Sequence, residues 1–122
     1  MVELYNYKAK IIDIYDLDSC TGFIDVGFDI HYKEKMRLNG IDGPELRTKN
    51  IKEKELGYKA RDYVRDLILG ETVEIKTTKE DKYGRYLVDI YLPDGTHLNK
   101  HLIDIGYAKE YHGGKKEKWF DD

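Results

Sequence analysis

The spacing of apolar residues changes twice along this chain, and this constrains the fold more than any other feature. Apolar and polar residues alternate through most of residues 7–39, which is typical of strands with one buried face. Over residues 51–69 the spacing becomes helical, with an apolar face made of Leu56, Ala60, Tyr63, Val64, Leu67 and Ile68. Alternation returns after residue 70. One amphipathic helix between two groups of strands predicts a small α+β domain that is mainly β.

Turn residues set the expected limits of the elements. The predicted strands are residues 7–15, 20–30, 32–39, 73–76 and 86–92. In the first strand Ala9 and Ile11 are assigned to one face and Ile14 to the other. A second helix is expected over residues 98–105, with Leu98, Leu102 and Ile105 directed inward.

Composition limits the classes of protein to which the chain can belong. Its 122 residues suffice for one modest core, so we expect residues 1–122 to form a single domain and a monomer. The net charge of −3 argues against a protein that coats nucleic acid by bulk attraction. A single cysteine excludes an intrachain disulfide.

The first residues lack a basic segment followed by an apolar run, and no stretch is long enough to span a membrane. We therefore expect no membrane partner and, by default, a cytoplasmic location. Secretion after removal of a leader is the open alternative.

The clearest chemistry lies in residues 37–45, RLNGIDGPE. Pro44 fixes its own backbone angle and restricts the residue before it, so this turn is stiff. A stiff turn can hold Asp42 and Glu45 in defined positions beside Arg37. Carboxylates suit a hard cation and can act on water, while a planar guanidinium group binds phosphate oxygens. The segment therefore predicts a site for a metal ion and a phosphodiester.

A second segment, DKYGR at residues 81–85, supplies another arginine, Arg85. Taken alone, Arg85 would be interpreted as one partner of a surface salt bridge. Asp42 would be interpreted as a residue whose side chain hydrogen-bonds the backbone of its own turn. Together with Arg37 and Glu45, both residues are better explained by function.

RLNGIDGPE, followed about forty residues later by DKYGRYLVDIY, resembles the staphylococcal nuclease (thermonuclease) family, most closely its compact bacterial and bacteriophage-type members. The resemblance runs from about residue 8 to about residue 116. It implies a five-stranded OB-fold Greek-key barrel with two or three helices. It also implies a thermonuclease-like hydrolase, a calcium-dependent endonuclease that cleaves DNA and RNA, single-stranded or locally opened, to 3′-phosphate and 5′-hydroxyl ends.

The resemblance also assigns roles to individual residues. Catalytic residues would be Arg37 and Arg85, which hold the phosphate, and Glu45, the general base. Metal ligands for Ca²⁺ would be Asp18, Asp42 and the backbone carbonyl of Gly43. Substrate contacts would be Lys82, Tyr83 and Tyr111.

Two positions depart from the family pattern. The turn at residues 16–19 reads Asp-Leu-Asp-Ser where the family has Asp-Gly-Asp-Thr, so Leu17 replaces a glycine. If that position needs a positive φ, leucine would be strained by about 1 kcal/mol or more and the metal geometry would change. Gly43 replaces the threonine of the best-known member, although a glycine carbonyl can still bind a metal.

Two alternatives from other classes remain at this point. One is a non-catalytic nuclease-like OB module that binds nucleic acid or protein, and the other is a metal-bound phosphate-binding domain without turnover. Non-catalytic modules typically lose some of the arginines, the glutamate or the aspartates. This chain keeps all five, namely Asp18, Arg37, Asp42, Glu45 and Arg85, which favours the enzyme.

Overall fold

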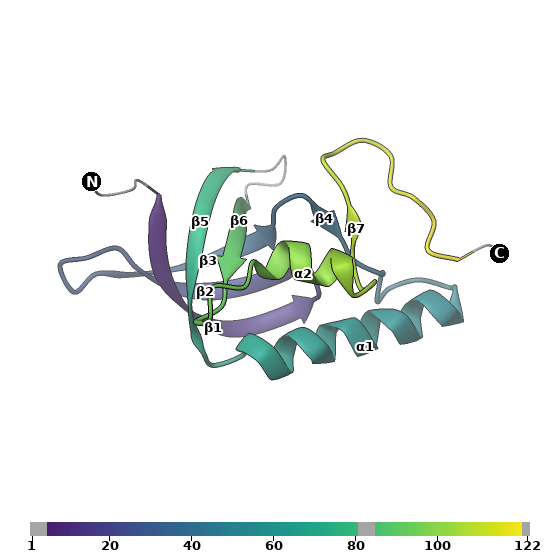
Figure 1. Ribbon diagram of the computed structural model, residues 1–122, viewed down its shortest axis with the longest axis horizontal. Coiled ribbons are helices and arrows are strands. Elements are labelled where there is room, and N and C mark those ends of the chain that lie inside the picture. Colours follow the sequence, from purple (N-terminus) through teal and green to yellow (C-terminus); the bar gives the residue numbers. More distant parts are fainter. Residues whose placement is uncertain (1–4, 81–84, 121–122) are drawn as a thin grey trace.

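The computed structural model describes residues 5–80 and 85–120. Its elements in chain order are β1 (Asn6–Asp16), β2 (Ser19–Asp25), β3 (His31–Leu38), β4 (Ile41–Asp42), α1 (Ile51–Ile68), β5 (Thr72–Glu80), β6 (Tyr86–Tyr91), α2 (Leu98–Asp104) and β7 (Lys109–Glu110). Figure 1 shows the long strands gathered together, with α1 beneath them and the C-terminal segment looping out beyond β7.

Across the described residues, five strands close into a barrel in the order β1-β2-β3-β6-β5. Neighbouring strands are antiparallel except β3 and β6, which run parallel and are connected through β4, α1 and β5. The two short strands β4 and β7 pair with each other outside the barrel. The predicted fold class, a mainly β α+β domain with a five-stranded OB-type barrel, is confirmed.

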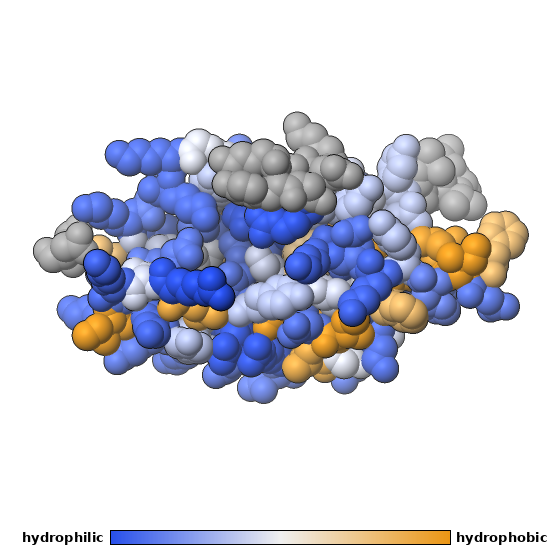
Figure 2. Space-filling model, turned by 180° about the vertical axis from the view of Figure 1, so that it is seen from behind, coloured by the Kyte–Doolittle hydropathy of each residue, from blue (hydrophilic) through white to orange (hydrophobic). Residues whose placement is uncertain are grey.

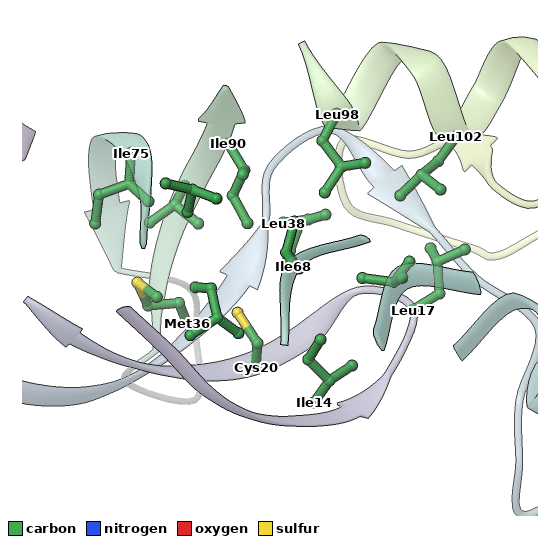
Figure 3. Packing of buried hydrophobic residues seen from close by; sticks show 14 of the residues in the cluster. Ile14, Leu17, Cys20, Met36, Leu38, Ile68, Ile75, Ile90, Leu98 and Leu102 are labelled. Carbon is green, nitrogen blue, oxygen red and sulfur yellow. The ribbon is translucent and has the colours of Figure 1, made fainter. Parts of the chain in front are cut away.

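The barrel interior and the two helices share one hydrophobic core. Figure 3 labels part of it, Ile14, Leu17, Cys20, Met36, Leu38, Ile68, Ile75, Ile90, Leu98 and Leu102, and each of these is at most 2% exposed. Fully burying an aliphatic side chain of this size contributes about 1.5–3 kcal/mol. Leu17 lies in the turn between β1 and β2, directly before Asp18, so this turn is anchored in the core.

Two expectations about the strands are wrong. The sequence placed Ile14 on the opposite face of β1 from Ala9 and Ile11. The β1–β2 register shifts between Ile11 and Asp13, and the extra residue of this bulge puts Ile14 on the same buried face as Ile11. Strict alternation cannot reveal such a bulge. β2 ends at Asp25, because the Val26 N–H donates to the Ile30 carbonyl and closes a hairpin turn inside the strand predicted over residues 20–30, around Gly27, a residue that had indicated only a bend or bulge in that strand.

Both helices lie where the apolar spacing placed them. α1 begins after Asn50, whose side chain accepts a hydrogen bond from the Glu53 N–H at 3.0 Å. α2 ends at Asp104, so Ile105 lies beyond the helix and is 42% exposed, contrary to its inward assignment. No helix in the described parts of the chain has the length and apolar character needed to cross a bilayer.

The face seen in Figure 2 is mainly hydrophilic, and apolar surface gathers at the end where the β2–β3 hairpin projects. At the tip of this hairpin Phe28 is 96% exposed. Phe28 and Asp29 both have positive φ, 55° and 60°, as a tight hairpin turn requires. The tip therefore presents an aromatic ring that the core does not use.

Candidate active site

Arg37 lies at the centre of the site, near the end of β3. Its Nη1 donates to Asp18 Oδ2 at 2.9 Å, and its Nη2 donates to the Ile41 carbonyl at 3.0 Å. The same Nη2 is 3.9 Å from Asp42 Oδ1. Only 11% of the Arg37 side chain is exposed, so its guanidinium group is held in one orientation.

Asp18 and Asp42 approach Arg37 from two different elements, and both are buried. Asp18 precedes β2, and the register between β2 and β3 places Ser19 opposite Arg37. The Gly43 N–H donates to Asp18 Oδ2 at 3.2 Å, so the β1–β2 turn is joined to the segment after β4. Pairing between β-strands thus brings together two carboxylates that are far apart in sequence.

Leu17 and Gly43 fit each other. A Cβ at Gly43 would lie 2.9 Å from Leu17 Cδ2, closer than real Cβ atoms are found, and 3.0 Å from Leu17 Cβ, which is tighter than most real contacts. The described non-glycine residues with positive φ are Tyr5, Phe28 and Asp29, so Leu17 carries no such strain. The two departures from the family pattern are therefore complementary, because leucine at position 17 fills the space next to position 43.

Glu45 is held by α1. Its backbone N–H donates to Glu53 Oε2 at 2.8 Å, while its side chain is 54% exposed and open to water. A Cβ at Gly57 would lie 3.0 Å from the Pro44 carbonyl and 3.1 Å from the Glu45 carbonyl. The absence of a side chain at Gly57 therefore allows α1 to approach the turn that carries Glu45. This explains why a glycine, which destabilises a helix interior, occurs in α1.

Arg85 lies directly before β6, on the same side of the barrel as Arg37. Its Nη1 donates to Ser19 Oγ at 3.5 Å, and Ser19 is the residue paired with Arg37 across β2 and β3. The other two predicted contacts from this segment, Lys82 and Tyr83, lie outside the described residues.

The C-terminal segment closes the site from the side of β4. β4 and β7 pair Asp42 with Lys109, and the Tyr111 N–H donates to the Gly40 carbonyl at 2.8 Å. The Tyr111 ring centroid is 5.8 Å from Arg37 Cζ. Lys116 extends from the same segment and places its Nζ 3.1 Å from Asp42 Oδ1 and 3.6 Å from Glu45 Oε1.

The predicted site residues that the structure describes therefore lie in one region, namely Asp18, Arg37, Asp42, Gly43, Glu45, Arg85 and Tyr111. Residues 35–120, which carry most of them, match the family of staphylococcal nuclease homologues. The chain belongs to this family. The resemblance inferred from the two motifs is thereby confirmed.

Several relatives of this nuclease homologue come from distant organisms. An uncharacterized protein of Methanocaldococcus jannaschii is 31% identical over 87% of this chain and 60% of its own length. An uncharacterized endonuclease of Escherichia coli is 34% identical over 84% of this chain and 60% of its own length. Endonuclease YhcR of Bacillus subtilis is 31% identical over 70% of this chain and 8% of its own length. The chain thus spans 60% of the length of the first two relatives.

The donor atoms of this nuclease homologue suit a hard cation. Asp18 and Asp42 are buried carboxylates, and the lysine ammonium against Asp42 shows that a cation is accommodated there. Within residues 5–80 and 85–120, no three His, Cys, Asp or Glu side chains form a metal-binding group on their own. The two carboxylates would need a backbone carbonyl and oxygens from water or substrate to complete a shell, as calcium sites allow.

Two charged residues of this site were missed from the sequence. Asp16 lies against Asp18, and its Oδ1 is buried without a hydrogen-bond partner in the described structure. Burial and the adjacent Asp18 carboxyl raise the pKa of Asp16 to about 7. Its position two residues before Asp18 was the available signal, because the bulge that ends the β1–β2 pairing places both carboxyls together.

Nothing in the sequence indicated that Lys116 belongs to the site, since it lies in a polar tail without periodicity. Partial burial acts to lower the pKa of Lys116, but its contacts with Asp42 and Glu45 outweigh this and raise the pKa. Its ammonium therefore stays charged where it meets the two carboxylates.

Proposed function

We propose that this chain is a calcium-dependent nuclease that hydrolyses phosphodiester bonds in DNA, and in RNA, to 3′-phosphate and 5′-hydroxyl ends. The observation that carries the proposal is the position of Arg37. Its guanidinium group is almost fully buried, bonded to Asp18 at 2.9 Å and 3.9 Å from Asp42. A fixed phosphate-binding group beside two buried carboxylates is the arrangement that metal-assisted phosphodiester hydrolysis needs.

The residues that would hold calcium are Asp18, Asp42 and the Gly43 carbonyl. When bound there, calcium would polarise a phosphoryl oxygen and bring a water molecule close to phosphorus. Both carboxylates are buried, and hydrogen bonds from Arg37 and from the Gly43 N–H hold Asp18 in place, so Asp18 would need little reorganisation to bind the ion.

Arg37 and Arg85 would bind the phosphate. Arg37 uses one donor on Asp18 and one on the Ile41 carbonyl, which leaves further N–H groups for phosphate oxygens. In our proposal both guanidinium groups stabilise the charge that develops on those oxygens in the transition state.

Glu45 would accept a proton from the attacking water. Its carboxylate is exposed to solvent, so water reaches it directly, and it shares the Lys116 ammonium with Asp42. A carboxylate is a weak base, so the main contribution of Glu45 would be to orient the water.

Tyr111 would contact a base of single-stranded or locally opened nucleic acid, because its ring lies beside Arg37. Lys82 and Tyr83 remain predicted substrate contacts, and a monomer acting without a membrane remains the expected form.

Digestion of a 5′-labelled single-stranded DNA tests the proposal. We expect cleavage with calcium, none with chelator, and restored cleavage when calcium is added in excess, with 3′-phosphate ends on the products. Cleavage that persists in chelator, or that only zinc restores, would contradict the calcium assignment. Binding without cleavage under all conditions would identify a non-catalytic nucleic-acid-binding module.

A further inference from the structure

Lys116 places a positive charge where the proposed cation would bind. Its Nζ lies 3.1 Å from Asp42 Oδ1 and 3.6 Å from Glu45 Oε1, and 5.6 Å from the Tyr111 ring centroid. An exposed ion pair contributes little to a protein. Here, however, one partner is the buried carboxylate of Asp42, whose other counter-charge among residues 5–80 and 85–120 is the more distant Arg37.

The charges around this point favour exchange with a divalent ion. Among the groups that Arg37 and Lys116 join in ion pairs, Asp18, Asp42 and Glu45 bring three negative charges and the two basic residues bring two positive charges, which leaves a net charge of −1. If a divalent cation replaced the ammonium, the same group would be neutral. Retaining both cations would instead place like charges against the same Asp42 oxygen, so occupancy by one disfavours the other.

The ammonium can leave without disturbing the core. The Lys116 side chain is 44% exposed, and it follows Gly113 and Gly114, both with positive φ and with open space where a Cβ would point. A cavity of about 150 Å³, lined in part by Asp42 and Tyr111, lies beside it. The rest of the segment stays attached, because Lys109 Nζ donates to the Lys118 carbonyl at 2.7 Å.

We propose that Lys116, which also contacts Glu45, competes with the metal for Asp42, and thereby sets the cation concentration to which the site responds. This inference rests on the proposed function, which supplies the cation. Calcium binds only to molecules in which the ammonium has left the two carboxylates, so its apparent affinity is reduced by the fraction of molecules in that state. Lys116 is therefore a residue that determines metal affinity, not a contact for the reacting phosphate.

Calorimetric titration of calcium into three proteins tests the inference: wild type, Lys116→Gln and Lys115→Gln. Lys115 is the matched control, because it is an exposed neighbour with the same charge and no ion pair to either carboxylate in the described structure. We expect calcium to bind Lys116→Gln about tenfold more tightly than wild type. Lys115→Gln should remain within about twofold, since solvent and salt screen its charge.

Amide hydrogen exchange of residues 111–118 gives a second readout that does not depend on activity. Calcium should increase exchange of this segment in wild type, because the ammonium is released, and should change it little in Lys116→Gln. Equal tightening in both variants would reduce the effect to general electrostatics and overturn the inference. Weaker binding by Lys116→Gln would overturn it too, by showing that the lysine supports the metal site.

Failure of the proposed function gives a different result. If none of the three proteins binds calcium, the metal assignment falls and the competition falls with it. If all three bind calcium with the same affinity, the metal assignment stands and only the role of Lys116 is lost.

Discussion

At the scale of single residues, the geometry of Arg37 explains why lysine could not replace it. The guanidinium group bonds Asp18 and the Ile41 carbonyl with different nitrogens and still has N–H groups for a ligand. A lysine ammonium is a single point that cannot reach both partners and a phosphate in fixed directions. Because Arg37 is buried, a nitrogen that loses its hydrogen-bond partner cannot bond to bulk water instead, so the substitution leaves an unsatisfied polar group.

We therefore expect Arg37→Lys to lower kcat by roughly 10²-fold or more while the protein stays folded. Steady-state kinetics on single-stranded DNA, with circular dichroism to check the fold, measure both effects. Arg61→Lys is the matched control, because Arg61 bonds Asp62 on the surface of α1, and its kcat should stay near the wild-type value. A near-normal rate for Arg37→Lys would remove Arg37 from the mechanism.

The sequence predicted part of the site for a local reason. Arg37, Asp42 and Glu45 lie within nine residues, so the stiffness of one proline-containing turn was enough to group them. Lys116 could not be found in this way, because it reaches Asp42 only through the pairing of β4 with β7. Each of these strands has two residues, too few to show alternation in a sequence.

At the scale of elements, the β1–β2 turn and the segment after β4 are shaped to each other. The strain that leucine would carry in a glycine conformation does not arise, because Leu17 has ordinary backbone angles and a buried side chain. The same side chain occupies the space into which a residue at position 43 would extend. A single sequence could show the two departures but not their contact, because pairing between distant strands creates it.

A double-mutant cycle on this pair has a defined expected outcome. Gly43→Thr alone should destabilise the protein by about 1–3 kcal/mol, because its side chain meets Leu17. Leu17→Gly alone should cost about 2–5 kcal/mol through the cavity that it leaves. The double variant should be more stable than the sum of the two effects predicts, by roughly 1 kcal/mol or more, because threonine occupies part of the vacated space. Urea unfolding of all four proteins in chelator measures this, and simple additivity would show that the side chains do not interact.

At the scale of the whole molecule, the site lies where the closed barrel meets the C-terminal segment. Asp18 and Arg37 come from strands or turns of the barrel, while Tyr111 and Lys116 come from the segment after β7. The alternating pattern predicted the barrel because each strand buries one face, whereas the tail lacks a buried face of its own. In our proposal, the barrel carries the buried carboxylates and the more exposed C-terminal segment carries the competing lysine, so metal affinity can be changed without changing the stability of the barrel.

Cys20 can report how rigid the barrel is. It lies on β2 between Ile14 of β1 and Met36 of β3, with its thiol in the core. Burial, with the nearby Asp16 and Asp18 charges, raises the pKa of this thiol to about 12, so little thiolate exists at pH 8. A closed barrel has no edge strand at which the chain can open locally. Reagents should therefore reach Cys20 only through large-scale unfolding.

Labelling of Cys20 by an aromatic disulfide at pH 8 should then be at least about 10³-fold slower in the folded protein than in the urea-unfolded one. The rate should rise with low urea concentrations along the slope of global unfolding. Calcium should slow it further, because a ligand that binds only the folded state lowers the population of open molecules. Fast labelling that ignores both urea and calcium would show instead that β2 separates from β3 locally, in which case the Ser19–Arg37 register would not hold the site rigid.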